Sequence, residues 1–214
     1  MRIYPTNNNN NYSVNFGALR VAQITSRINK EETTFIYRIE KNKDFDFCRM
    51  LKNRLIQSNP ERMQVSNPNI KNFVRSAFDS FAISDYSAIG VRNNKPFGLL
   101  SILSNNSDNE AHLKYLLTWK TPDLTKIKNG GRDLINFIFN KYENKNSINL
   151  TPAFDSEIFY YKFGFDFENE YERDQMSIFS KDIKTQLREL LDKFTYKNIE
   201  DSNSEDLSKI VTLD

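Results

Sequence analysis

Cysteine is nearly absent from this chain of 214 residues, which contains only Cys48. A single cysteine excludes an intramolecular disulfide framework and any zinc site built from several cysteines. Its apolar neighbours Phe45, Phe47 and Met50 predict a buried thiol rather than a reactive one. Histidine is equally scarce, because His112 is the only one and has no nucleophile-elbow sequence beside it. The sequence therefore offers no Ser-His-Asp triad, and Cys48 is a poor nucleophile.

A large net charge is also missing, since 30 Lys and Arg residues against 28 Asp and Glu residues leave +2. Such a chain lacks the field typical of proteins that bind nucleic acid or an anionic membrane. The sequence has no basic N-terminal segment followed by an apolar run, and no apolar run long enough to span a bilayer. We therefore expect a cytoplasmic globular protein that binds neither nucleic acid nor membrane.

Composition and pattern divide the chain into three stretches. Residues 1–28 are predicted to be a polar, Asn-rich N-terminal extension, with a flexible tail at 1–13 that includes the asparagine run 7–11. Residues 29–183 are predicted to form one α/β domain. Residues 184–214 are predicted to be an amphipathic helix with a polar acidic tail. No internal repeat is present.

Hydrophobic periodicity predicts alternating strands and helices within the central stretch. The predicted strands are 34–41, 86–91, 97–103, 111–119, 147–154 and 175–180. The predicted helices are 44–57, 69–83, 130–142, 157–163 and 185–194. Early strands that are neighbours in sequence pair as hairpins, whereas the later strand–loop–helix–strand unit needs a parallel crossover. The fold class expected is α/β (α+β), a mixed central sheet with helices on both faces.

Within the strand predicted at 111–119, four apolar residues recur at every second position: Leu113, Tyr115, Leu117 and Trp119. Side chains alternate between the two faces of a strand, so this spacing predicts that the four lie on one side of the sheet.

A glycine-containing loop with local positive charge follows this strand. It carries Lys126, Lys128, Asn129, Gly130, Gly131 and Arg132 just before an apolar helical pattern. A helix N-terminus presents free N–H groups and a partial positive charge, which suit a pyrophosphate. The two glycines leave room for the ligand, and Asn129 tolerates a left-handed backbone. The alternative is a Gly-Gly turn that opens an ordinary surface helix flanked by solvated lysines.

The segment FYYKFGF at 159–165 contains a second candidate group, Tyr160. A tyrosine with a pKa near the ordinary value of about 10 stays protonated at neutral pH. It can therefore give a proton or hydrogen bond to a basic group. The alternative is that Tyr160 and Tyr161 are packing residues on an aromatic helix, which is the interpretation that we favour for Tyr161.

The element order and these two motifs resemble the GNAT superfamily of N-acetyltransferases, over about 33–183. The family loop Q/R-x-x-G-x-G/A holds the pyrophosphate of acetyl-CoA, which implies that role for the loop 126–132. Lys126 stands where the family has Arg or Gln, and Asn129 where it has its first glycine. The family motif F-Y-x-x-x-G-F implies that Tyr160 is the general acid. The resemblance also implies that the backbone of Leu117 and Thr118 pairs with the pantetheine arm.

Two features of the resemblance leave alternatives open. The family often has an asparagine seven residues before the tyrosine, where this chain has Ala153, so Asp155 or Ser156 would have to replace its contact. Some members place a base on the strand that carries His112, whose ordinary pKa of about 6.5 suits that task. Glu110, Asp85, Asp123 or a chain of waters are alternatives for the base.

The resemblance implies transfer of an acetyl group from acetyl-CoA to a primary amine by direct attack in a ternary complex, without a metal. The acceptor is a small molecule or peptide, bound by residues within about 45–83 and 168–173. The protein is expected to be a monomer or homodimer. One alternative is a catalytically inactive GNAT-shaped CoA-binding or regulatory module, which Asn129 and Ala153 favour. A nucleic-acid-binding α/β domain is a further alternative, against which the near-neutral charge argues.

Overall fold

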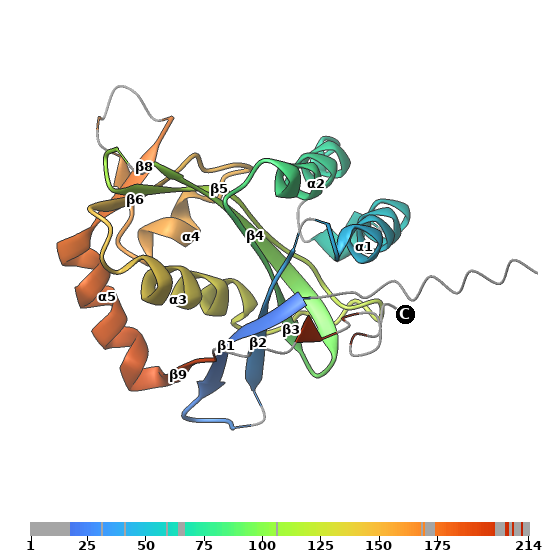
Figure 1. Ribbon diagram of the computed structural model, residues 1–214, viewed down its shortest axis with the longest axis horizontal. Coiled ribbons are helices and arrows are strands. Elements are labelled where there is room, and N and C mark those ends of the chain that lie inside the picture. The colour runs from blue at the N-terminus through green and yellow to red at the C-terminus, as the bar shows by residue number, and fades with distance from the viewer. Residues whose placement is uncertain are drawn as a thin grey trace, which may run out of the picture.

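The computed structural model describes residues 18–30, 32–40, 42–58, 60–63, 67–105, 107–167, 169, 174–199, 204, 205, 207 and 211. The tail predicted at 1–13, with its asparagine run, lies outside these residues, as does most of the acidic tail. The described residues form a three-layer structure in which one sheet separates two groups of helices (Figure 1).

The sheet contains ten strands within the described part of the chain. They are β1 (Ala18–Ser26), β2 (Thr33–Arg38), β3 (Tyr86–Arg92), β4 (Lys95–Asn105), β5 (Glu110–Thr118), β6 (Ser147–Leu150), β7 (Asp166–Phe167), β8 (Met176–Phe179), β9 (Phe194–Asn198) and β10 (Ser204–Glu205). Their order is β10-β1-β2-β3-β4-β5-β6-β8-β7, with β9 also paired to β1. Only the β5–β6 pair is parallel among these strands. The expected mixed sheet, with its parallel crossover, is confirmed.

Helices cover both faces of the sheet. One face carries α1 (Phe45–Gln57) and α2 (Ile70–Asp79), with the 3-10 turns Pro60–Met63 and Ser80–Ala82. The other face carries α3 (Gly130–Tyr142), α4 (Glu157–Tyr161) and α5 (Ser180–Lys193). Figure 1 shows α1 and α2 to the right of the sheet, and α3 and α5 to its left. The fold class expected from the sequence is therefore confirmed.

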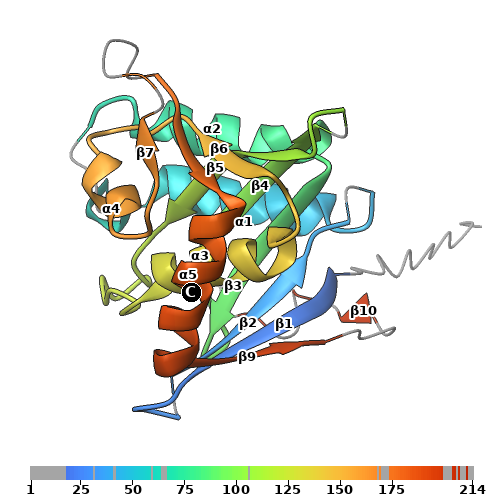
Figure 2. The same ribbon diagram turned by 90° about the vertical axis from the view of Figure 1, so that its left-hand side faces the viewer.

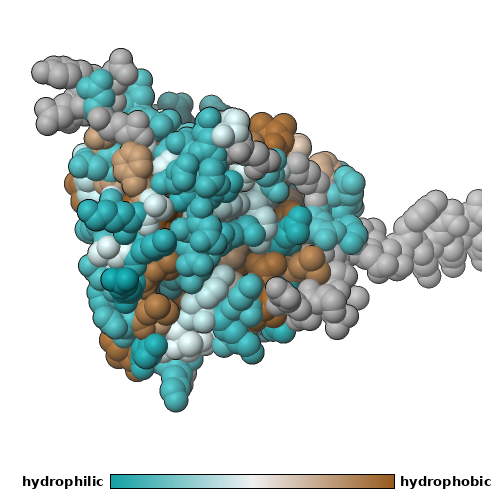
Figure 3. Space-filling model, turned by 60° about the vertical axis from the view of Figure 1, so that its left-hand side comes forward, coloured by the Kyte–Doolittle hydropathy of each residue, from teal (hydrophilic) through white to brown (hydrophobic). Residues whose placement is uncertain are grey.

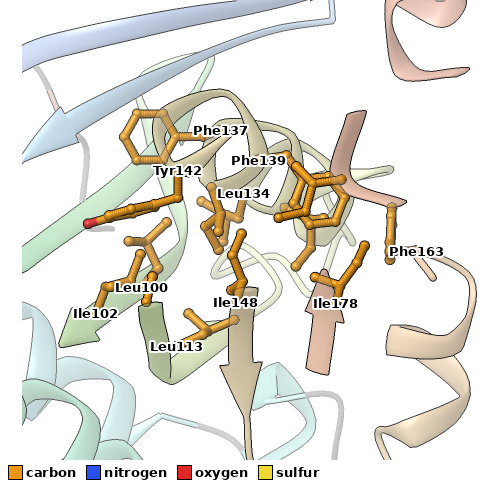
Figure 4. Close-up of a cluster of buried hydrophobic side chains, with 14 of the residues drawn as sticks. Leu100, Ile102, Leu113, Leu134, Phe137, Phe139, Tyr142, Ile148, Phe163 and Ile178 are labelled. Atoms are coloured by element: carbon orange, nitrogen blue, oxygen red, sulfur yellow. The ribbon is translucent and has the colours of Figure 1, made fainter. Parts of the chain in front are cut away.

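The larger of the two cores lies between α3 and the sheet. Leu134, Ile135 and Ile138 repeat at helical spacing, and each is fully buried. Figure 4 shows Leu134 and Phe139 on the side of α3 that faces Ile148 of β6. Burying one such side chain contributes about 1.5–3 kcal/mol to the free energy of unfolding. Since α5 packs against α3 from outside, α3 is buried on most sides and its N-terminus is held in place.

The second core lies under α1 and α2. Phe47 and Leu51 of α1 and Val74 of α2 are buried there. Cys48 is buried with them, as predicted, although Phe45 is 63% exposed. Burial raises the pKa of the Cys48 thiol well above its ordinary value, with the nearby Asp44 carboxylate acting in the same direction. The thiol is therefore protonated at neutral pH.

The predicted alternation along β5 is wrong. Register against β4 passes from Ile102–Leu113 to Ser101–Tyr115, so β5 has one extra residue, Lys114. A bulge of this kind resets which residues face each side of the sheet. Leu113 consequently packs in the α3 core, whereas Tyr115, Leu117 and Trp119 pack in the core under α1 and α2.

Three strands of the first edge, β1, β9 and β10, are missing from the sequence-based prediction. β1 lies within the range predicted as the N-terminal extension, and it pairs with β2 in the sheet. A bulge at Val21 interrupts its alternation, which hides the period of two. β9 begins directly after α5 and runs antiparallel beside β1 (Figure 2). Residues from the predicted extension and from the C-terminal stretch thus belong to the same sheet as the central residues.

Candidate functional site

β5 and β6 separate at the centre of the sheet. Their parallel pairing begins at Glu110–Ser147 and ends at Leu113–Leu150. β6 ends there, but β5 continues to Thr118. The last five residues of β5 therefore present backbone groups on this side that β6 does not use. Open sheet edges of this kind accept an extended ligand as an added strand.

The loop after β5 leads directly into the N-terminus of α3. Asn129 takes the left-handed conformation, with φ 63° and ψ 9°, and its side chain makes no cap hydrogen bond. This is the conformation that the sequence suggested asparagine would tolerate. A Cβ at Gly130 would lie 2.7 Å from the ring of Phe97, so glycine lets the loop pack directly on β4. A Cβ at Gly131 would lie 3.1 Å from Phe159.

A buried ion pair fixes the loop from behind. Arg92 Nη2 lies 2.5 Å from Asp133 Oδ2, and Thr34 Oγ1 donates a hydrogen bond to the same oxygen at 2.5 Å. Arg92 Nη1 also donates to the carbonyl of Lys128 at 2.8 Å. Burial raises the pKa of Asp133 to about 6, against the opposing effects of the Thr34 hydrogen bond and the Arg92 charge. Removing one partner of such a pair costs about 3–5 kcal/mol.

A cavity of about 340 Å³, which we call the loop pocket, lies at the N-terminus of α3. Loop residues 126, 127 and 129–132 line it together with Thr118 and Glu189. Four cationic side chains line it: Lys126, Arg132, Lys162 and Lys193. The guanidinium of Arg132 lies over the ring of Phe194, 5.7 Å from its centroid. Figure 3 views the side on which α5 lies, where hydrophilic residues cover most of the surface and apolar ones show between them.

A second cavity of about 200 Å³, the splay pocket, lies where β5 and β6 separate. Its walls come from β5, the segment after β6, α2 and α4. Apolar and aromatic residues dominate them, among others Met63, Ile70, Phe73, Tyr115 and Phe154. The two pockets share three lining residues: Thr118, Gly131 and Phe159. They are therefore neighbours, and we call the two together the groove.

Tyr160 lines the splay pocket from α4. Its side chain is 7% exposed, and its ring packs edge-on against Phe159 and Phe165. Burial raises the pKa of Tyr160 well above its ordinary value. The phenol therefore keeps its proton at neutral pH. Tyr161, by contrast, is 47% exposed and lines neither pocket.

The residues near Ala153 are held by a short turn. Phe154 and Asp155 both have positive φ angles, of 55° and 57°. The backbone N–H of Ala153 donates to Ser156 Oγ at 3.1 Å. Ala153 and Ser156 both line the splay pocket, whereas Asp155 does not. Of the two residues suggested as substitutes for the family asparagine, Ser156 has the suitable position.

His112 lies on β5 outside the lining of both pockets. It stands opposite Asn149, whose Nδ2 donates to Glu110 at 2.9 Å. Burial, followed by the charge of Lys114, lowers the pKa of His112 below 6.5. Asp85 and Asp123 also line neither pocket. The Asp85 carboxylate instead accepts a hydrogen bond from the backbone N–H of Ser104.

Most of the residues predicted from the sequence lie along the groove. The loop pocket is lined by Thr118, Lys126, Asn129, Gly130, Gly131 and Arg132, and the splay pocket by Leu117, Thr118, Gly131 and Tyr160. Lys128 and His112 line neither pocket. Sequence reasoning missed Lys162, Lys193 and Phe159. Phe159 and Lys162 stood within the FYYKFGF segment, but no local signal pointed to Lys193.

Neither a metal-binding cluster nor a membrane-spanning helix is found within the described residues. They contain no group of three or more His, Cys, Asp or Glu side chains placed to hold a metal ion. No helix in this part of the chain has the length and apolar character needed to cross a membrane.

No protein-family model matches the chain, and no curated protein matches its sequence. The structure of AtaTR bound with AcCoA matches with 13% identity and a TM-score of 0.50, over 71% of this chain and 96% of that one. The PaiA N-acetyltransferase of Thermoplasma acidophilum in complex with coenzyme A has 16% identity and a TM-score of 0.49, over 68% and 98%. A Desulfovibrio desulfuricans structure, described as an acetyltransferase of the GNAT family, has 12% identity and a TM-score of 0.48, over 69% and 99%. This chain has the GNAT acetyltransferase fold, and at these identities the similarity shows the fold alone.

Proposed function

We propose that this protein transfers the acetyl group of acetyl-CoA to a primary amine. One observation carries the proposal: the loop pocket and the splay pocket meet at Thr118, Gly131 and Phe159. A single extended ligand can therefore reach from the N-terminus of α3 to Tyr160. The GNAT fold supports this assignment, since the AtaTR structure with that fold contains AcCoA.

The loop pocket fits the charged end of CoA. α3 leaves its first backbone N–H groups without partners inside the helix, and the side chain of Asn129 does not cap them. We assign the pyrophosphate to the loop Asn129, Gly130, Gly131 and Arg132, and in particular to the N–H groups of Gly131 and Arg132, because free N–H groups and the helix dipole together bind anions. The N–H of Gly130 donates to the carbonyl of Ile127 at 3.3 Å. Lys126 and Arg132 add positive charge from the pocket wall. Lys128 helps to position the loop, because its backbone carbonyl accepts a hydrogen bond from Arg92.

The end of β5 fits the pantetheine arm. Leu117 and Thr118 follow the point at which β5 loses β6, so their backbone groups can pair with the amides of the arm. The arm would then pass Gly131, against which the ring of Phe159 packs closely. This path ends in the splay pocket, where Tyr160 lies.

The chemistry follows from direct attack. The amine nitrogen forms a bond to the acetyl carbon while the carbon–sulfur bond breaks. The raised pKa keeps Tyr160 protonated near neutral pH but makes it a weaker acid, so Tyr160 acts by hydrogen-bonding the departing sulfur as charge develops, and passes on a proton that solvent replaces. The amine releases its surplus proton to water, and we propose His112 as the relay. The rate derives mainly from holding both substrates in the reacting orientation.

Two measurements test the proposal. CoA is titrated into the protein by calorimetry, and release of free thiol from acetyl-CoA is then measured with a panel of primary amines. We expect CoA binding and amine-dependent thiol release. Absence of CoA binding would contradict the proposal. Retention of the protein on DNA or RNA would contradict the further prediction that it binds no nucleic acid.

Two observations favour a second candidate, a CoA-binding or regulatory module without catalysis. His112 lies outside both pockets, and Ala153 occupies the position of the family asparagine in the splay pocket. CoA binding without turnover of any amine would support this candidate.

The domain boundaries at 29 and 183 also remain a prediction, and limited proteolysis would test them.

A further inference from the structure

The splay pocket has an aromatic wall built from three separate elements. Phe73 of α2 packs edge-on against Tyr115 of β5, with 5.2 Å between ring centroids. The same ring packs against Phe154, which follows β6, at 5.0 Å. The bulge at Lys114 is what turns Tyr115 towards this side of the sheet. Since the ring of Phe73 contacts both of the others, the wall is formed before any ligand enters.

The charge of this pocket has one sign only. Among the described residues that line it, Lys114 is charged and none is Asp or Glu. A ligand with several positive charges would lose water on entry and would find no carboxylate to replace it. It would also meet the like charge of Lys114. By contrast, the same like charge favours the neutral, nucleophilic form of a single amine.

The size of the pocket sets a further limit. Its volume of about 200 Å³ is below the range of roughly 300–1,000 Å³ that is common for sites of drug-sized ligands. An apolar cavity of about 150 Å³ is enough for a benzene molecule. Because the acetyl group and the end of the arm would occupy part of this volume, only a small apolar group beside the amine fits, and a large polar acceptor would have to leave most of its surface outside.

We infer that the acceptor is a primary amine whose neighbouring group is aromatic or branched aliphatic, and which has no second positive charge. This inference rests on the proposed function, because it assigns the acceptor to the pocket in which the acetyl group would lie. Two sources share the chemistry: a free arylalkylamine, and a peptide N-terminus that begins with a large apolar residue. The aromatic wall contacts the apolar group, and the amine lies between that wall and Tyr160.

The first experiment measures binding rather than turnover. Protein saturated with CoA is titrated calorimetrically with phenethylamine, with the peptide Phe-Gly-Gly and with spermidine. We expect at least one aromatic ligand to bind 10-fold or more tightly than spermidine, and the stronger of the two identifies the source. Equal or tighter binding of spermidine, or no binding of either aromatic ligand, overturns the inference.

A charge reversal sharpens the same test. Lys114→Glu should tighten spermidine binding about 10-fold and leave CoA affinity unchanged, whereas Lys184→Glu, on the exposed side of α5, should change neither. If CoA binds the wild-type protein but the order of amines is opposite to the one expected, only the acceptor inference fails. If CoA does not bind at all, the proposed function fails and the acceptor inference with it. Unchanged spermidine affinity in Lys114→Glu also counts against the inference.

Discussion

The loop pocket and the splay pocket share three residues but differ in their chemistry. The loop pocket combines backbone N–H groups with the cations Lys126, Arg132, Lys162 and Lys193. The splay pocket is lined mainly by apolar side chains from four elements, with Lys114 as the one charge among the described lining residues. Under the proposed function, the loop pocket binds the pyrophosphate of CoA, for which backbone groups and positive charge suffice. The splay pocket binds the amine acceptor, which its side-chain rings would select. Changes at each end should therefore have separable effects.

The largest effect is expected at the shared residue Gly131. In Gly131→Glu the new side chain starts 3.1 Å from Phe159 and carries a negative charge towards the loop pocket. We expect CoA affinity, measured by calorimetry, to fall by about 1,000-fold, or roughly 4 kcal/mol. Gly131→Ala is the matched control, since its methyl group needs only a small shift of Phe159 and should cost a few-fold. Unchanged affinity in Gly131→Glu would exclude the loop as the pyrophosphate site.

The next effect belongs to the splay pocket alone. Tyr160→Phe removes the proposed acid and keeps the ring packing against Phe159 and Phe165. We expect kcat to fall about 100-fold, a usual contribution of general acid catalysis, with CoA affinity unchanged. Tyr161→Phe changes an exposed residue and serves as the control. Equal turnover in Tyr160→Phe would mean that water or another group protonates the sulfur.

His112→Gln tests the proposed relay through its pH dependence. Imidazole accepts a proton only when neutral, and the pKa of His112 lies below 6.5 because of burial and the Lys114 charge. The ratio of wild-type to variant turnover should therefore rise as the pH increases from 5 to 7, to about 10-fold. A ratio near one throughout this range would assign the relay to water.

The same histidine affects stability. Its folded pKa is below the unfolded one, so its contribution to the free energy of unfolding is complete above pH 6.5 and is lost as the pH falls through the folded pKa. Urea unfolding should therefore show a smaller loss of stability between pH 7 and pH 5 in His112→Gln than in the wild type.

The smallest effect is expected at the rim of the loop pocket. Lys162→Ala removes one exposed cation, and exposed ion pairs contribute up to about 1 kcal/mol, so CoA affinity should fall about 5-fold. The loss should shrink at high salt, because exposed charges are screened. Amine binding in the splay pocket should not change. Lys184→Ala on α5 is the control, and an equal loss there would mean that general charge rather than Lys162 attracts CoA.

The sequence predicted the parts of the fold in which local pattern and packing agree. α1 and α3 have apolar residues at helical spacing, and the hairpin of β3 and β4 has turn residues between two apolar runs. β9 could not be predicted in this way. Phe194 continues the helical spacing of Leu187 and Leu190, so periodicity extends the helix by one residue into the strand. Only the pairing of β9 with β1, distant in sequence, decides its structure.

The candidate site also has residues with a local sequence signal and residues without one. The loop and Tyr160 have short sequence signals, because a helix start and a tyrosine before a glycine turn are local features. Lys193 has none, since it joins the loop pocket only through the packing of α5 on α3. Phe73, Tyr115 and Phe154 likewise meet only after the sheet and α2 assemble. The loop pocket therefore has local sequence signals, and the aromatic wall of the splay pocket has none.

The bulge in β5 also bears on how this gene tolerates change. A substitution at Lys114 alters one side chain, but an in-frame deletion of its codon would remove the extra residue that separates Leu113 from Tyr115 in the register. Leu113 and Tyr115 would then be neighbours in an unbroken ladder, so Tyr115, Leu117 and Trp119 would keep their side of the sheet. Loss of the Leu116 codon, by contrast, would turn Leu117 and Trp119 to the opposite core, because no bulge absorbs that change. We expect homologous genes to vary in both residue and length at position 114 and to keep the length of β5 beyond Tyr115.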